Sequence, residues 1–192
     1  MKEKSVVLSS GQQINCEAVV SCTGWGDHFS IFTPETKAEL GIPAYGQSNF
    51  KSPENVDIAW EKHDLNADKL VNKKLPFLAK GPDISKWHPG RVQPQRRWRL
   101  WNRTVPLSNA LAGDRSLVIL GQIHTTQTPT ISEIQSFWAI LYLLGEIPLP
   151  GNDTIVKEIA EWNAWTRKRY ASCGQRYPYA LFDWIPVRRP ST

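Results

Sequence analysis

The chain has 192 residues, about the length of one globular domain, and its 41% hydrophobic and 21% charged residues are typical of a folded chain. The longest apolar run, residues 137–144, falls short of the ~18 residues that a membrane span needs, and no secretory signal is evident, so we expect a cytoplasmic protein. The net charge of +5 is a mild excess, which a phosphorylated cofactor or solubility alone can explain.

Cysteine and histidine usage offers no metal site and no disulfide. Cys16, Cys22 and Cys173 form no C-x-x-C pair, and the four histidines are widely scattered. No G-x-S-x-G motif of a serine hydrolase occurs. We therefore expect reduced thiols, no bound metal and no hydrolase activity.

The first elements read as a hairpin followed by a buried strand. Residues 5–8 and 12–15 flank Ser9-Ser10-Gly11, small residues that favour a tight turn. The run Ala18 to Cys22 has no polar alternation, which predicts a strand buried on both faces. It ends at Thr23-Gly24-Trp25-Gly26, where glycines allow the backbone to approach a ligand closely.

Residues 33–96 hold seven prolines and no sustained period, which predicts an irregular segment with a solvated, lysine-rich helix face near Lys69 to Lys80. The run Arg96 to Arg103 then interleaves cations with aromatic residues. A nucleic-acid groove uses such a pattern, but a half-buried strand with solvated guanidinium groups explains it better. Binding of nucleic acid is therefore kept only as a third alternative.

A second buried strand is predicted over Leu117 to Gly121, and a helix over Thr130 to Leu144. Thr130-Ile131-Ser132-Glu133 fits a capping box, and Gly145 is placed to end the helix. Two apolar stripes predict that this helix is buried on most sides. We expect the two buried strands, residues 18–22 and 117–121, to be neighbours in one small sheet, with the helix packed on it.

The last predicted element is an amphipathic covering helix that begins at Asn152 or Asp153 and runs to Gly174. Its apolar stripe consists of Ile155, Ile159, Trp162 and Tyr170, and basic residues fill its final turns. The residues that follow are aromatic and then polar, which is typical of a fraying tail.

Two blocks of the sequence carry motifs that occur together in one order. The first is a hairpin and buried strand that end in a threonine-glycine-aromatic signature, here Val6-Val7-Leu8, Gly11, Ile14, Glu17 to Val20 and Cys22-Thr23-Gly24-Trp25. The second is a strand ending in glycine before a helix, here Trp98 to Trp101, Val105-Pro106, Leu117 to Gly121, Pro129, Ser132-Glu133, Gln135 and Trp138. In this order the motifs resemble the C-terminal portion of fungal FAD-dependent monooxygenases of the flavin-containing or Baeyer–Villiger-like type.

The resemblance implies an α/β fold, namely a single, truncated FAD/NAD(P)-binding (Rossmann-like) domain spanning residues 1–192. Its sheet and helix core would comprise residues 1–32 and 97–174, with an irregular insertion at 33–96, C-terminal helices, and a tail at 175–192. The C-terminal residues Trp162-Asn163 and Arg169-Tyr170 through Phe182-Asp183-Trp184 are similar to those of fungal members associated with secondary metabolism, which implies a role in secondary metabolite biosynthesis.

By the same resemblance, FAD would be the cofactor and NADPH a possible co-substrate in the oxidation of a small organic molecule by O₂. The residues that would approach FAD lie after the two predicted strands: Thr23, Gly24, Trp25, Gly121, Gln122, His124, Thr126 and Thr130. An ordinary strand-end turn at Thr23 and Gly24, and a solvent-exposed loop histidine at His124, remain open alternatives. No catalytic residue is assigned.

The sequence departs from the family in one consequential way, because no G-x-G-x-x-G occurs and Phe29 stands where the third glycine belongs after Gly24 and Gly26. That turn holds the diphosphate of a dinucleotide at a helix N-terminus. We therefore expect weak binding of FAD by this chain alone, and a homo- or hetero-oligomer with a chain that supplies the N-terminal half. A non-catalytic scaffold, a subunit or an inactive remnant of the family is the alternative.

Overall fold

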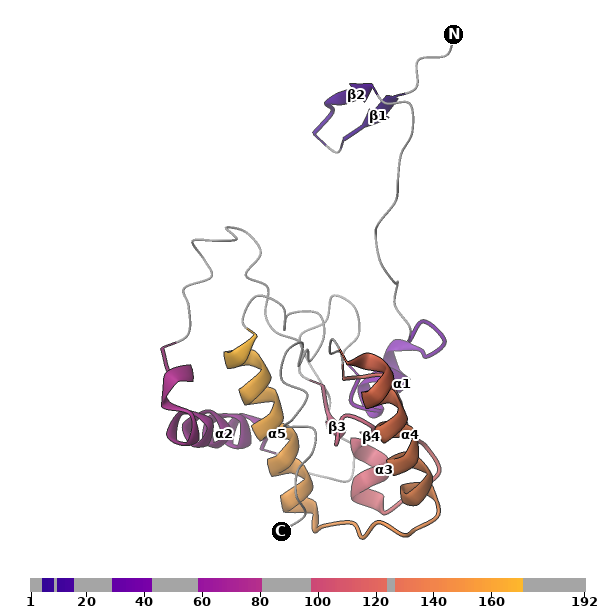
Figure 1. Cartoon of the computed structure of the whole chain (residues 1–192), viewed down its shortest axis with the longest axis vertical. Helices are drawn as coiled ribbons and strands as arrows, with labels where there is room; N and C mark the ends of the chain where they lie inside the picture. Colours follow the sequence, from indigo (N-terminus) through magenta and orange to yellow (C-terminus); the bar gives the residue numbers. More distant parts are fainter. Residues whose placement is uncertain are drawn as a thin grey trace. The chain divides into compact units, whose positions relative to one another are not determined.

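The computed structural model describes residues 5–8, 10–15, 29–42, 59–80, 98–123 and 127–170. The chain divides into two compact units, Met1–Ile31 and Phe32–Thr192, which are treated separately below (Figure 1). No helix within the described ranges is both long enough and apolar enough for a membrane crossing. The predicted strand over residues 18–22 and all three cysteines lie outside the described residues. The division of the chain at residues 33–96 and 175–192 stays a prediction.

The first unit contains the hairpin expected from the sequence. Strands β1 (Ser5–Val7) and β2 (Gln13–Asn15) pair antiparallel. Gly11 provides the turn with a left-handed φ of 83°, which glycine adopts without steric cost. The Gly11 N–H closes the turn by donating to the carbonyl oxygen of Leu8 at 2.9 Å. The hairpin prediction is confirmed.

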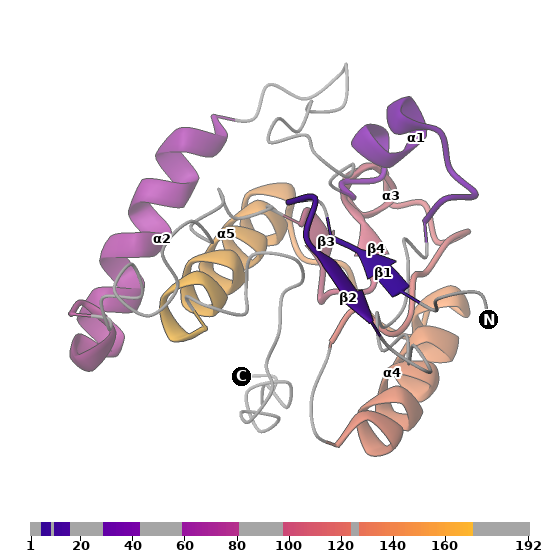
Figure 2. The same ribbon diagram turned by 90° about the horizontal axis from the view of Figure 1, so that it is seen from above.

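The second unit combines helices with one small antiparallel ladder. Its elements are α1 (Pro34–Glu39), α2 (Trp60–Lys74), the 3₁₀ helix η1 (Pro76–Leu78), β3 (Leu100–Trp101), β4 (Val105–Pro106), α3 (Leu107–Ala112), α4 (Thr128–Leu143) and α5 (Asn152–Arg169). The β3–β4 hairpin lies between α5 and α4, and α2 lies beside α5 (Figures 1 and 2). Mixed helix and strand content agrees with the predicted α/β class. The described strands form only two-stranded antiparallel sheets, so the Rossmann-like arrangement stays an expectation.

Helix α5 is the central element of this unit, although the sequence predicted a covering helix. It begins at Asn152 as expected and ends at Arg169. One face buries Ile155 and Ile159 in a core cluster with residues of β3, β4 and α3. The opposite face carries the small residues Ala160 and Ala164, which form a second cluster with residues of α2. Small side chains at this contact allow the two helix axes to approach closely.

Helix α2 is the longest described element within residues 33–96, the segment predicted to be irregular with a lysine-rich helix face. It has 15 residues, yet only Ala67 and Val71 among its apolar side chains are buried. Because this apolar face is so narrow, packing on α5 contributes more to helix stability than the local sequence does. The lysines Lys69 and Lys73 are exposed, as predicted for a solvated helix face.

The guanidinium group of Arg99 is buried, which corrects the prediction that the cations of the Arg96 to Arg103 run are solvated. Arg99 is 2% exposed and donates two hydrogen bonds to the carboxylate of Asp64 on α2, at 3.3 and 3.1 Å. Its guanidinium carbon also lies 3.5 Å from the ring centroid of Trp60. Arg103 is buried as well, at 3% exposure. Side chains held in this way cannot line a nucleic-acid groove.

Residues 117–121 form no strand, so the predicted second buried strand is wrong. A strand requires a ladder of backbone hydrogen bonds, and among the described residues this segment makes one backbone–backbone bond, from the Ile119 N–H to the carbonyl oxygen of Thr104 at 2.7 Å. Leu120 is exposed and Ile119 buried, so the segment is apolar but not enclosed on both faces. The sheet that was to join residues 18–22 with 117–121 is therefore absent from the part of the chain that the structure describes.

Helix α4 starts at Thr128, two residues earlier than predicted. Thr130 lies within the first turn, so the predicted capping box does not form, and Gln127 takes the cap position without a capping hydrogen bond from its side chain. Pro129 is compatible with this start because the first turn of a helix makes no use of its N–H groups. The predicted end is confirmed: Gly145 adopts a φ of 85° and its N–H donates to the carbonyl oxygen of Tyr142.

The two apolar stripes of α4 differ in burial. Ile131 and Tyr142 on the first stripe are buried. Phe137, Ile140 and Leu144 on the second stripe are 66%, 56% and 70% exposed. The prediction that this helix is buried on most sides is wrong for the described residues, because the elements around it contact only the first stripe. We call Phe137, Ile140 and Leu144 the outer stripe.

Candidate functional site

The structure describes three of the eight residues predicted to approach a cofactor. Gly121, Gln122 and Thr130 are described, whereas Thr23, Gly24, Trp25, His124 and Thr126 lie outside the described residues. Whether the two predicted groups meet in space is therefore not decided by this structure.

Gly121 and Gln122 connect the segment before α4 to that helix. Gly121 has a left-handed φ of 79°, and its N–H donates to the side-chain oxygen of Gln135 at 3.2 Å. Gln122 is buried, and its side-chain oxygen has no hydrogen-bond partner among the described residues. Thr130, in contrast, is exposed at the N-terminal turn of α4. The predicted residues thus flank the start of α4, but they do not close a site by themselves.

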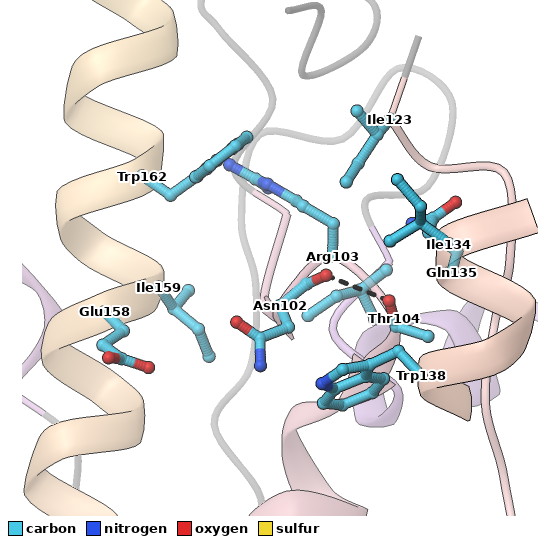
Figure 3. A pocket seen from close by; sticks show the side chains of 11 residues that line it. Asn102, Arg103, Thr104, Ile123, Ile134, Gln135, Trp138, Glu158, Ile159 and Trp162 are labelled. Atoms are coloured by element: carbon cyan, nitrogen blue, oxygen red, sulfur yellow. Dashed lines mark hydrogen bonds between the residues drawn. The ribbon is translucent and has the colours of Figure 1, made fainter. Parts of the chain in front are cut away.

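A cavity of about 200 Å³ lies beside this segment, between α4 and α5 and above the turn that joins β3 to β4 (Figure 3). Its lining residues come from all of these elements and are Leu100, Asn102, Arg103, Thr104, Ile123, Ile134, Gln135, Trp138, Glu158, Ile159 and Trp162. Most of the wall is apolar, and a few polar groups are placed within it. This composition is typical of small-molecule sites in proteins.

Arg103 is the principal charged group of the cavity. Together with Asn102 it occupies the β3–β4 turn with a positive φ, 60° for Arg103 and 47° for Asn102. Its Nη2 donates to the side-chain oxygen of Asn163 at 2.9 Å, and the Asn163 amide in turn donates to the carbonyl oxygen of Trp98 at 2.8 Å. The Nε and Nη1 groups of Arg103 have no hydrogen-bond partner among the described residues.

Further polar atoms of the cavity are also donors without a described partner. The side-chain nitrogen of Gln135 and the indole nitrogen of Trp162 are buried and make no hydrogen bond within the described part of the chain. The side chain of Arg103 extends towards Trp162, with its guanidinium carbon 5.4 Å from the centroid of that ring (Figure 3). The acidic group of the lining, Glu158, accepts a hydrogen bond from the indole N–H of Trp101 at 2.8 Å.

Burial is the largest influence on the pKa of Arg103. Desolvation, and then the positive charge of Arg99, lower the pKa of Arg103 well below its ordinary value. A guanidinium group nevertheless stays protonated in proteins near neutral pH. The cavity therefore contains a buried cation whose charge is unfavourable until a group rich in acceptors lies beside it.

Sequence reasoning missed this cavity. Gln135 and Trp138 entered only as family motifs, and Arg103 was interpreted as part of a solvated run. A signal was available, because Asn163 interrupts an otherwise apolar helix stripe, and a polar residue at such a position usually serves a buried partner. The partner itself, 60 positions away in the chain, could not be identified without the structure.

The cavity does not fit FAD, the cofactor that the resemblance implies. Its volume of about 200 Å³ is below the ~300–1,000 Å³ of sites for drug-sized ligands, and FAD is larger than those ligands. The described residues also include no glycine-rich turn at a helix N-terminus that could hold a diphosphate. This cavity therefore cannot hold the whole cofactor.

The chain is similar to several fungal proteins over almost all of its length. An FAD-dependent monooxygenase of Pyrenophora dematioidea is 35% identical over 185 residues, which are 96% of this chain and 32% of that protein. FAD-dependent monooxygenases of Aspergillus nomiae and Aspergillus sclerotiorum are 32% and 33% identical, over 96% of this chain and 31% of their own lengths. No family model and no solved structure matches the chain.

This chain spans about a third of the length of these curated relatives. Such coverage is consistent with the C-terminal portion of a monooxygenase that the order of the motifs indicated. Over almost all of its length, the chain is similar to a C-terminal portion of fungal FAD-dependent monooxygenases.

Proposed function

We propose that this chain is a truncated portion of an FAD-dependent monooxygenase-type oxidoreductase that acts in fungal secondary metabolite biosynthesis. Once complemented by the dinucleotide-binding remainder, it would take part in the oxidation of a small organic substrate by NADPH and O₂. The observation that carries this proposal is the similarity, over 96% of the chain, to relatives named for FAD-dependent monooxygenation.

In that assembly FAD would supply the redox chemistry and the activation of O₂. The chain's own residues would position the flavin and shield it. The N-terminal turn of α4, with Thr130 exposed on it, carries a partial positive charge and suits a polar edge of a ligand. Gly121 and Gln122 precede this turn and would complete the contact. The diphosphate would be held by the complementing chain, because the described residues offer it no cradle.

The outer stripe of α4 supports the need for that complementing chain. Its three large apolar side chains are each more than half exposed, and burying such a side chain contributes about 1.5–3 kcal/mol. The relatives contain about two thirds of a monooxygenase that this chain does not match. We assign the portion of a monooxygenase that corresponds to this unmatched length as the occupant of the outer stripe, since large exposed apolar faces mark interaction sites.

The test combines this chain with the separately produced remainder of the Pyrenophora dematioidea relative. Flavin retained after gel filtration, read at ~450 nm, and consumption of NADPH are measured for each part and for the mixture. We expect neither signal from this chain alone and both from the mixture. Co-elution without flavin or turnover would identify a non-catalytic scaffold and refute the enzymatic proposal.

A matched pair of variants tests the role of the outer stripe. Ile140→Asp places a charge on the exposed stripe and should abolish co-elution, with the helical content of the chain unchanged because the site is exposed. Glu133→Asp, which keeps the charge of another exposed position on the same helix, should co-elute as the unmodified chain does. Equal co-elution of both variants would exclude the outer stripe as the contact.

A further inference from the structure

We propose that the cavity between α4 and α5 binds the carboxylate of a small aromatic acid, with Arg103 and Gln135 as the recognition groups. The described residues that line the cavity lie between Leu100 and Trp162 and do not include Gly121, Gln122 or Thr130, the described residues proposed to approach FAD. The proposal therefore does not rest on the monooxygenase function.

Two energetic costs are concentrated at Arg103. Its guanidinium group is almost fully buried, and its backbone is left-handed, a conformation that costs a residue with a side chain about 1–2 kcal/mol. Strained backbone and incompletely paired buried charge are both costly, and they recur together at ligand sites. The guanidinium group has five N–H donors, and the hydrogen bond to Asn163 uses only one of them.

The hydrogen-bonding character of the cavity selects an acceptor. The buried atoms that lack a described partner here are donors: Nε and Nη1 of Arg103, the side-chain nitrogen of Gln135 and the indole nitrogen of Trp162. Carboxylates accept through two oxygens and match the planar fork of arginine. Glu158 does not compete for this role, because its carboxylate is oriented by the indole N–H of Trp101.

The apolar wall and the volume define the rest of the ligand. Ile123, Ile134, Ile159 and the rings of Trp138 and Trp162 line the cavity, so the body of the ligand is apolar. A cavity of about 150 Å³ with apolar walls is large enough for benzene. The ~200 Å³ available here therefore suits one aromatic ring that carries a carboxylate.

The test uses the 192-residue chain and 4-fluorobenzoate, whose fluorine resonance broadens on binding. The neutral analogue 4-fluorobenzamide is the comparison ligand, because it has the same size and brings two donors to a site that already has donors. We expect a dissociation constant between about 10 μM and 1 mM for the benzoate, and at least tenfold weaker binding of the benzamide.

Variants assign the binding to the cavity. Arg103→Met should weaken binding of the benzoate by about ten- to a hundredfold, as expected for loss of charge-assisted hydrogen bonds. Gln135→Glu keeps an oxygen for the Gly121 N–H but replaces the donor nitrogen with an acceptor, so it should weaken binding at least tenfold even where Arg103→Met fails to fold. Lys157→Gln removes an exposed cation from α5 outside the cavity and should change binding less than twofold.

Three results would overturn the proposal. The first is absence of broadening at about 10 mM benzoate, which would mean that water alone satisfies the buried donors. The second is equal binding of benzoate and benzamide, which would exclude charge recognition. The third is a loss with Lys157→Gln as large as that with Gln135→Glu, which would indicate attraction to the net positive charge of the chain rather than to the cavity.

Discussion

Removal of the Asp64 carboxylate should destabilise the second unit strongly, because it leaves the buried Arg99 guanidinium without its main counter-charge. The pair joins α2 to the start of β3 through two hydrogen bonds, and both side chains are less than a tenth exposed. Breaking a buried ion pair by removal of one partner costs about 3–5 kcal/mol. Trp60 still contacts the guanidinium group in the variant, so we expect the lower end, about 3 kcal/mol, for Asp64→Ala.

Urea unfolding followed by circular dichroism measures this effect. With a slope of about 2 kcal/mol per molar urea, a loss of about 3 kcal/mol lowers the midpoint by about 1.5 M. The matched control is Asp68→Ala on the same helix, which gains the same helix propensity but removes only a partly exposed partner of Arg167 and Lys168. Surface pairs of this kind contribute about 1 kcal/mol or less, so the control should shift the midpoint by less than about 0.5 M.

A second substitution separates the buried charge from the lost contact. Asp64→Ala combined with Arg99→Met removes both charges of this pair, so the double variant should be more stable than Asp64→Ala alone. The reasoning would be refuted if Asp64→Ala and Asp68→Ala lowered the midpoint equally, or if the second substitution added its own loss to the first. Either result would mean that the unpaired charge of Arg99 is not the cause of the stability lost in Asp64→Ala.

Two further predictions concern the same unit. Gly41→Ala should cost more stability in urea than Gly145→Ala, by about 1–3 kcal/mol: both glycines have a positive φ, but only at Gly41 would the added Cβ lie 2.5 Å from the carbonyl oxygen of Arg99. Equal losses of stability in the two variants would show that the positive φ, and not the close approach of Arg99, is what requires glycine at position 41. Hydrogen bonds from the Ser116 side chain and backbone lower the pKa of Asp114 in the folded state, so its stabilising contribution is complete above the unfolded pKa of about 3.9 and is lost as pH falls through the folded value. The difference in Tm between the unmodified chain and Asp114→Asn should therefore be largest near pH 6 and should decrease as the pH falls below the unfolded pKa of about 3.9; a difference that does not change with pH would contradict this.

Local chemistry allowed several elements to be predicted from the sequence. The hairpin around Gly11, the start of α5 at Asn152 and the end of α4 before Gly145 all depend on residues within a few positions of one another. Turn and helix-end preferences act over that distance, so a reader of the sequence has all the relevant information. The resemblance to fungal FAD-dependent monooxygenases was also accessible from the sequence, and relatives of that name match 96% of the chain.

Predictions failed where partners distant in the chain decide the outcome. Residues 117–121 have the composition of a buried strand, but a strand also needs neighbours, and none of the described segments pairs with them. Arg99 belongs to a run that looks solvated, yet Asp64 lies 35 positions earlier and makes its burial possible. The outer stripe of α4 is as apolar as the buried one, and nothing in its own sequence indicates which stripe faces the core.

The cavity depends on tertiary structure for the same reason. Each of its polar groups looks ordinary in sequence: Arg103 in a basic run, Gln135 within a helix, Trp162 on an apolar stripe. The fold places them around one volume because α4 and α5 pack on opposite sides of the β3–β4 hairpin (Figure 3). The sequence by itself indicated the resemblance to fungal monooxygenases. It also determined the turn at Gly11, the start of α5 and the end of α4, since these local features depend on neighbouring residues. Which cations are buried, and what surrounds them, was decided only by the tertiary structure, because the charges that make burial favourable come from distant parts of the chain.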